Sequence, residues 1–281
     1  MIRAALAAAA ARLAGDTPRL DAELLMAHAL AIPRETLLMR HLDDPVPAGF
    51  AALLDRRIAH EPVAYITGGR AFWTIDLVVG PGVLVPRADT ETLLEAAVAH
   101  FAGTPGPARI LDLGTGSGAL LLAALDEWRE ARGVGIDRSP EALAVAADNA
   151  ARLGLADRAR IMTGGWAGTG ERFDLILCNP PYIAADAVLP PEVARYEPPS
   201  ALFAGADGLD DYRVIAPLLP AQIAPGGMAA IEVGAGQAAD VAALLFAQGL
   251  DTAVAHDLAG RARCVIARPG AEERGRRSMT G

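Results

Sequence analysis

The chain of 281 residues contains no lysine, so all 25 of its basic side chains are arginines. Acidic residues outnumber them at 34, and the formal net charge is −9. An extended nucleic-acid-binding surface needs a basic footprint, which this composition does not supply. We therefore do not expect direct binding of DNA or RNA over a large surface.

Cysteine and aromatic residues are also scarce. The two cysteines, Cys178 and Cys264, fit neither a metal-ligand spacing nor a disulfide framework, which favours a reducing, cytoplasmic location and no metal site. Aromatic residues make up 5% of the chain, so Ala, Leu and Val must supply most of the core. With 52% hydrophobic and 21% charged residues, the composition is that of a folded globular protein.

Uninterrupted hydrophobic runs long enough to cross a membrane are absent as well. The uncharged run 214–231 is broken by three prolines and by a pair of glycines. The Ala-rich start, 1–15, has apolar residues at helical spacing and is interrupted by Arg12, which predicts an amphipathic helix rather than a signal peptide. We expect no membrane span.

The pattern of the chain changes along its length. Residues 1–75 show helical spacing without strand-like alternation, and they predict a small helical domain in which Asp21 is an N-cap and Arg57 faces solvent. Strand-like residues followed by Gly-Pro-Gly predict a β-hairpin linker over 76–90. Residues 91–268 would form a catalytic domain, and the polar end, 269–281, a flexible tail.

The predicted catalytic domain alternates apolar strands with helices. Strands are predicted at 109–113, 133–137, 159–162, 173–178 and 228–233, and helices at 118–131, 140–153 and 239–248. Near-continuous apolar strands that are separated by helices favour an α/β fold with a parallel sheet covered on both faces.

A glycine-rich turn follows the first of these strands. It reads Gly114-Thr115-Gly116-Ser117-Gly118, and Asp137 ends the next strand. Glycines at such a junction let the backbone approach a ligand closely, and an acidic side chain after the next strand can accept hydrogen bonds from ribose hydroxyls. The pattern indicates a nucleoside cofactor. Because Ala119 completes a dinucleotide fingerprint, this motif alone leaves the cofactor's identity open.

A second motif, Asn179-Pro180-Pro181-Tyr182, directly follows the strand 173–178. Ligands of open α/β sheets bind outside the carboxyl ends of the strands, so this loop should face the same crevice as the glycine turn. Two prolines stiffen the backbone and remove two donors. Asn179 Oδ1 and the Pro180 carbonyl could each accept one N–H of a planar NH2 group, with Tyr182 against its face.

Together these motifs resemble those of the S-adenosylmethionine-dependent amino-methyltransferases, and more narrowly those of the release-factor glutamine methyltransferase (PrmC/HemK) family. The narrower resemblance covers about residues 20 to 268. The segments that carry it are 21–25, 62–68, 72–73, 83–91, 195–198, 207–210 and 257–261.

The resemblance implies a class I methyltransferase sheet of seven mostly parallel strands with the last one antiparallel, and an N-terminal helical domain that helps to dock a protein substrate. It implies S-adenosylmethionine as cofactor, with S-adenosylhomocysteine as product. The glycine turn would line its methionine part, Asp137 would hold its ribose and Trp166 would lie at its adenine. The residues so assigned to the cofactor are Gly114, Thr115, Gly116, Ser117, Gly118, Asp137, Trp166 and Asn179. Those assigned to the substrate are Asn179, Pro180, Pro181 and Tyr182, with catalysis by Asn179, Pro180 and Tyr182.

The implied reaction is methyl transfer to the side-chain amide nitrogen (N5) of the glutamine in the Gly-Gly-Gln motif of class 1 peptide chain release factors, by a monomeric enzyme. Two relatives of this reaction remain open: a ribosomal-protein glutamine methyltransferase, and an adenine-N6 nucleic-acid methyltransferase that would have to flip its base into the pocket. An NAD-dependent oxidoreductase is disfavoured because no constellation for hydride transfer is evident, and a non-catalytic binding module is the remaining alternative. Asp112 and Glu91 are predicted to be structural or to lie on the cofactor side.

Overall fold

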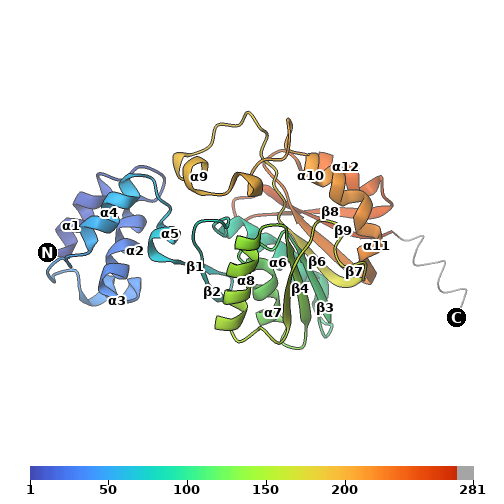
Figure 1. Cartoon of the computed structure of the whole chain (residues 1–281), viewed down its shortest axis with the longest axis horizontal. Helices are drawn as coiled ribbons and strands as arrows, with labels where there is room; N and C mark the ends of the chain where they lie inside the picture. The colour runs from blue at the N-terminus through green and yellow to red at the C-terminus, as the bar shows by residue number, and fades with distance from the viewer. Residues whose placement is uncertain (271–281) are drawn as a thin grey trace, which may run out of the picture. The chain divides into compact units, whose positions relative to one another are not determined.

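The computed structural model describes residues 1–270, so the predicted tail from 271 to 281 lies outside the described residues. The chain forms two compact units, whose elements are labelled in Figure 1. The first unit consists of Met1–Gly69, Val79–Pro81 and Leu189–Glu197. The second consists of Arg70–Val78, Gly82–Val188 and the chain from Pro198 onward.

The first unit is helical, as its spacing predicts. Its helices are α1 (Ile2–Ala10), α2 (Pro18–Leu30), α3 (Arg34–Arg40), α4 (Phe50–Ile58), α5 (Val63–Thr67) and α9 (Pro191–Tyr196). Ile2, Leu6 and Ala9 are buried on one side of α1, which confirms the predicted amphipathic helix. The late segment that contains α9 was predicted to belong to the catalytic domain, but the Tyr196 hydroxyl donates to the Ala59 carbonyl of the helical unit at 3.0 Å.

Two predicted surface features of this unit are wrong. Helix α2 begins at Pro18 with Thr17 as its N-cap, so Asp21 lies inside the first turn. Its Oδ2 accepts from Arg57 Nε at 2.8 Å, and both side chains are only 9% exposed. A buried charge needs a partner, and each of these residues supplies one to the other. Helical spacing alone does not reveal such an ion pair.

The β-hairpin lies earlier than the predicted linker. It consists of β1 (Gly69–Phe72) and β2 (Ile75–Val78), so its turn is Trp73-Thr74 rather than Gly-Pro-Gly at 80–82. Trp73 has a left-handed φ of 54°, an uncommon conformation for a bulky residue. Its backbone N–H donates to Glu91 Oε1 at 2.8 Å. Glu91 is therefore structural, as predicted.

The second unit is built on a seven-stranded sheet with the order β5-β4-β3-β6-β7-β9-β8. The strands are β3 (Arg109–Leu113), β4 (Arg132–Asp137), β5 (Ala159–Thr163), β6 (Phe173–Cys178), β7 (Ile223–Glu232), β8 (Leu250–His256) and β9 (Ala262–Pro269). Strands β3 to β7 pair in parallel, whereas β9 is antiparallel to β7 and β8. This confirms the predicted α/β class. Pro269, predicted to begin the tail, ends β9.

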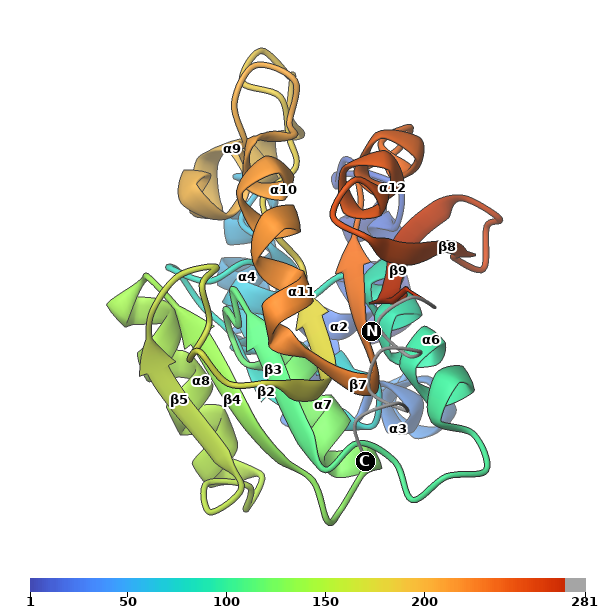
Figure 2. The same cartoon turned by 90° about the vertical axis from the view of Figure 1, so that its right-hand side faces the viewer.

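Helices cover both faces of this sheet. Figures 1 and 2 show α6 (Glu91–Phe101), α7 (Ala119–Glu127) and α8 (Pro140–Arg152) on one face. The other face carries α10 (Asp210–Ile215), α11 (Leu219–Gln222) and α12 (Ala238–Phe246). The central strands are fully buried: Leu111, Ile176 and Ile231 have no exposed surface. Among residues 1–270, no helix combines the length and the apolar character that crossing a membrane requires.

The buried side chain of Asn149 joins three elements of this unit. Its Oδ1 accepts from the Val78 N–H at 2.8 Å, and its Nδ2 donates to the carbonyls of Val78 and Ser117, each at 2.9 Å. It thus links α8 to the hairpin strand β2 and to the glycine turn.

We predict that Asn149→Ala destabilises this unit by about 1–3 kcal/mol, because it leaves half-buried backbone groups of Val78 and the buried carbonyl of Ser117 without partners. The measurement is urea unfolding followed by tryptophan fluorescence, since all 3 tryptophans lie in this unit. The matched control is Asp148→Ala at the neighbouring exposed position, which should change the free energy of unfolding by less than about 0.5 kcal/mol. Equal effects of the two substitutions would contradict the prediction.

Candidate active site

The register of the central strand determines where the site forms. Leu113 at the end of β3 pairs with Ile136 of β4 on one side and with Cys178 of β6 on the other. The loops that follow these three strands therefore begin side by side. After β3 the chain first adds β4 and β5 on one side of this strand, and it then returns to add β6 and β7 on the other side. Such a reversal of strand order is the switch point at which α/β folds bind ligands.

A cavity of about 230 Å³ lies at this point. Its wall includes eight of the predicted site residues: Gly114, Thr115, Gly116, Ser117, Asp137, Trp166, Asn179 and Pro181. The two motif loops thus face one crevice, as the strand pattern predicts. Three predicted site residues, Gly118, Pro180 and Tyr182, are not on its wall. The wall also includes Thr90 and Asp112, two residues that were not predicted to contact substrate.

Glycine is required in the turn for two different reasons. Gly114 has a φ of 75°, and a Cβ there would stand 3.3 Å from the Trp166 ring, which also lines the cavity. Gly118 has a φ of 85°, and a Cβ there would meet Leu122 Cδ1 at 2.9 Å. Gly118 therefore serves the start of α7, whereas Gly114 allows close approach at the cavity.

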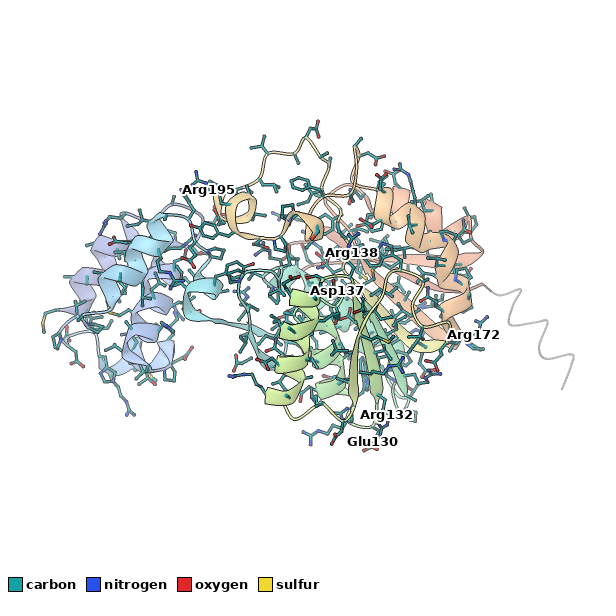
Figure 3. All side chains as sticks on the ribbon, in the orientation of Figure 1. Glu130, Arg132, Asp137, Arg138, Arg172 and Arg195 are labelled. Carbon is teal, nitrogen blue, oxygen red and sulfur yellow. The ribbon has the colours of Figure 1, made fainter. Side chains whose placement is uncertain are left out.

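The carboxylate of Asp137 is held by backbone groups on both sides. Its Oδ2 accepts from the Gly116 N–H and its Oδ1 from the Ser139 N–H, each at 2.9 Å. Figure 3 shows Asp137 and Arg138 at one end of β4, opposite Arg132 at its start. Each carboxylate oxygen can accept more than one hydrogen bond, so the group is oriented and can still bind a ligand hydroxyl.

Asp112 lies beneath the glycine turn and is 1% exposed. Its Oδ2 accepts from the Thr115 hydroxyl at 2.6 Å and from the Leu121 N–H at 3.3 Å, while Oδ1 has no hydrogen-bond partner within the described part of the chain. Burial raises the pKa of Asp112 to about 7, although these two hydrogen bonds act against the shift.

The Asn-Pro-Pro-Tyr loop is fastened at both ends. Asn179 is half-buried and its Nδ2 donates to Thr90 Oγ1 at 3.4 Å. The Tyr182 hydroxyl donates to Glu232 Oε1 at 3.2 Å, and burial raises the pKa of this phenol. Gln237 Nε2 donates to the Tyr182 carbonyl at 2.9 Å. The loop is therefore held by hydrogen bonds to residues outside it.

Sequence reasoning missed Thr90, Glu232 and Gln237. A signal for Glu232 and Gln237 was present in the sequence. Glu232 ends an apolar strand and Gln237 follows it, and the carboxyl ends of such strands carry ligand-binding residues. Thr90 lies in the segment 83–91 that carries the resemblance, but no motif marked it as a site residue, since it precedes a helix away from both motifs in the sequence.

Trp166 stands on the cavity wall with its ring fixed from behind. Its indole Nε1–H donates to Asp211 Oδ1 at 2.8 Å, and its carbonyl accepts from Gln222 Nε2 at 3.0 Å. The neighbouring Gly165 also lines the cavity, and a Cβ there would meet nothing within 4 Å. One flat aromatic wall beside open space suits a planar ring such as a purine.

Comparison with known proteins agrees with this geometry. A family model described as the PrmC N-terminal domain matches residues 4–68, and one described as a methyltransferase domain matches residues 107–204. A release factor glutamine methyltransferase of Rhodospirillum rubrum is 48% identical over 90% of this chain and 79% of its own length. The chain belongs to the release factor glutamine methyltransferase family. A second member, from Cereibacter sphaeroides, is 48% identical over 94% of this chain and 97% of its own.

Solved structures show the same fold at low identity. A methyltransferase from Pyrococcus furiosus has a TM-score of 0.53 at 17% identity, covering 78% of this chain and 96% of its own. A ribosomal protein L11 methylase from Lactobacillus delbrueckii has a TM-score of 0.50 at 19% identity, covering 68% and 84%. The predicted class I methyltransferase fold and the predicted family are thus confirmed, and the roles of individual site residues stay predictions.

The raised pKa of Asp112 has a measurable consequence for stability. The folded-state pKa of about 7 lies above the ordinary value of 3.8, so the folded protein binds this proton more tightly than the unfolded chain does. Asp112 therefore makes folding less favourable as the pH rises through this window. We predict that Asp112→Asn, measured by urea unfolding, becomes more stable relative to the wild type as the pH rises from about 4 to about 7. A stability difference that is independent of pH would contradict this prediction.

Proposed function

We propose that this family member transfers a methyl group from S-adenosylmethionine to the side-chain amide nitrogen (N5) of the glutamine in the Gly-Gly-Gln motif of class 1 release factors. The observation that carries the proposal is the single cavity shared by the glycine turn, Asp137 and the Asn-Pro-Pro-Tyr loop. The names of the relatives support the choice of substrate. We further propose that the enzyme is a cytoplasmic monomer and that it needs no direct contact with nucleic acid. The net charge of −9 favours this lack of nucleic-acid contact.

The residues of the cavity fit S-adenosylmethionine. A Cβ at Gly116 would meet nothing within 4 Å, so the turn leaves room for a ligand against its backbone. Asp137 is oriented to accept from ribose hydroxyls, and Trp166 offers a flat apolar wall for the adenine. The buried Oδ1 of Asp112, which no donor reaches among the described residues, is a negative acceptor suited to the cationic methionine end.

The reaction requires activation of a poor nucleophile. The lone pair of a carboxamide nitrogen is delocalised into its carbonyl, and the cofactor supplies, when bound, an electrophilic methyl group on a positively charged sulfur. Asn179 Oδ1 and the Pro180 carbonyl would each accept one N–H of the glutamine amide, raising electron density on the nitrogen. Their main contribution is a fixed orientation and preorganised electrostatics. No dedicated base is needed, because the alkylated nitrogen loses its proton readily.

An adenine-N6 methyltransferase is the second candidate, because the same two acceptors would suit an exocyclic amine. The acidic composition and the names of the relatives disfavour it. Mass spectrometry of a release factor after incubation with enzyme and cofactor tests the proposal: methylation of the Gly-Gly-Gln glutamine supports it. Incorporation into nucleic acid only would overturn it.

We predict that Asn179→Ala lowers kcat for release-factor methylation by about 100- to 1,000-fold, because one of the two acceptors aimed at the amide is lost. Affinity for S-adenosylhomocysteine, measured by calorimetry, should stay within about 3-fold of the wild type, a change of less than 1 kcal/mol. Near-normal turnover of this variant would rule out the acceptor-pair mechanism.

We predict that Asp137→Ala weakens S-adenosylhomocysteine binding by about 10- to 100-fold, which corresponds to one lost hydrogen bond to a charged group. The measurement is again calorimetry. Glu141→Ala is the matched control, because this exposed carboxylate lies in the first turn of α8 and is absent from the cavity wall. Equal affinities of Asp137→Ala and the control would reject the ribose-binding role.

A further inference from the structure

One buried carboxylate beside the Asn-Pro-Pro-Tyr loop has no role in the chemistry above. Glu232 ends β7 and is 1% exposed. Its Oε1 accepts from the Tyr182 hydroxyl at 3.2 Å, whereas no hydrogen bond of ordinary geometry reaches Oε2 within residues 1–270. An incompletely paired buried carboxylate is destabilising, so its presence requires a reason.

Thr90 connects this carboxylate to the catalytic amide. It is the N-cap residue of α6, it is 4% exposed, and it stands on the cavity wall. Its Oγ1 accepts from Asn179 Nδ2 at 3.4 Å. The same hydroxyl lies near the Glu232 carboxylate and lowers the pKa of that group, with a larger effect than that of the Tyr182 hydroxyl. A single hydroxyl therefore stands between Glu232 and Asn179.

The direction of these hydrogen bonds follows from the chemistry of the groups. An ionised carboxylate can only accept, so it attracts the one O–H of Thr90. The Thr90 oxygen can then interact with Asn179 only as an acceptor, through its lone pairs. Only the NH2 of the amide can donate to it. The amide oxygen must point the other way. Asn179 is a residue of the cavity wall, so an amide oxygen turned away from Thr90 can face the ligand.

We propose that Glu232, acting through the Thr90 hydroxyl, is a positioning residue that holds the Asn179 amide with its oxygen toward the cavity, and so makes the site selective for a group that donates N–H. The proposal rests on the proposed function for its consequence in catalysis, but the orientation of the amide is a property of the free protein. Glu232 accepts a hydrogen bond from Tyr182 and is not on the cavity wall, so we give it no role as a base.

Protonation of Glu232 would reverse the direction of both hydrogen bonds of the Thr90 hydroxyl. A protonated carboxyl can donate to Thr90 Oγ1, which frees the Thr90 O–H to donate to the amide oxygen of Asn179. The amide would then turn its NH2 toward the cavity, where it would oppose the NH2 of a glutamine. Burial raises the pKa of Glu232 to about 7, so this change falls within the neutral range.

The other groups around Glu232 do not titrate in that range. Burial raises the pKa of the phenols of Tyr182 and Tyr212 and of the thiols of Cys178 and Cys264, so all four stay neutral. The charged neighbours are Arg263, which lowers the pKa of Glu232, and Asp89, which raises it. Arg263 pairs with Asp89 at 2.9 Å and lies 3.6 Å from Asp257. The guanidinium thus has other partners than Glu232.

The chain offers a direct test, because Asn149 and Asn179 are its only asparagines. Protein labelled on the asparagine side-chain nitrogen gives two NH2 signals by NMR, and Asn179→Ala assigns them. In the wild type we expect the chemical shifts of the Asn179 NH2 group to change with pH, with a midpoint at a pH of about 7. The Asn149 signals should stay constant as an internal control. In Glu232→Gln and in Thr90→Val the Asn179 signals should lose this titration.

Kinetics provides the second measurement. Thr90→Val, which replaces the hydroxyl by a methyl group of similar size, should lower kcat by about 10- to 100-fold while affinity for S-adenosylhomocysteine stays unchanged. Thr90→Ser, which keeps the hydroxyl, should restore most of the activity. Thr92→Val is the matched control, because Thr92 is equally buried on the same helix and is absent from the cavity wall. At saturating S-adenosylmethionine, so that protonation of Asp112 at the cofactor site does not limit binding, kcat of the wild type should fall as the pH is lowered through about 7, and this fall should be absent in Glu232→Gln.

The outcomes separate this inference from the proposed function. Asn179 signals that do not titrate, or that titrate unchanged in Thr90→Val, would overturn the inference even if release factors are methylated. Conversely, titrating signals in a protein that methylates no release factor would overturn the proposed function and leave the positioning role intact. Equal kcat losses in Thr90→Val and Thr92→Val would also overturn the inference, because they would indicate a general packing effect.

Discussion

The parallel register of β3 with its two neighbours is the constraint on which the site depends. Because Leu113 is level with both Ile136 and Cys178, the glycine turn, Asp137 and Asn179 begin at one edge of the sheet. A slip of one residue would move side chains to the opposite face of the strand. The fully buried apolar residues of these strands resist such a slip, since it would expose them or bring polar groups into the core. The stability of the sheet and the geometry of the site therefore have the same origin.

Two buried carboxylates flank the loop that follows β6, and they share an electrostatic situation. Asp112 at β3 and Glu232 at the end of β7 are each 1% exposed, and burial raises the pKa of each to about 7. Both oppose folding when they ionise. Each also has one oxygen atom that accepts no hydrogen bond of ordinary geometry in the described chain. Ionised and incompletely paired, such groups are unfavourable for folding, and the roles proposed above give a reason for both to be present.

Much of the fold follows from local signals. The strands β3 and β6 have the predicted bounds because short, mostly apolar runs end in turns rich in glycine or proline. Strand β8 was not predicted from its residues, since its side chains are mostly exposed and show no regular alternation. The hairpin turn was misplaced because Trp73 adopts a left-handed conformation, which Glu91 stabilises from 18 residues away. Neither Asp21 nor Arg57 carries a local sign of their mutual burial.

The sequence by itself determined the family, the glycine turn after β3 and the Asn-Pro-Pro-Tyr loop after β6, because these are contiguous motifs whose backbone chemistry is local. Only the tertiary structure decided which motif residues reach the cavity. It assigned Gly118 to helix packing, left Tyr182 behind the wall, and brought Thr90 to the side chain of Asn179, 89 residues away. The physical reason is that hydrogen bonds between distant segments depend on how strands and helices pack, and neither composition nor spacing records that packing.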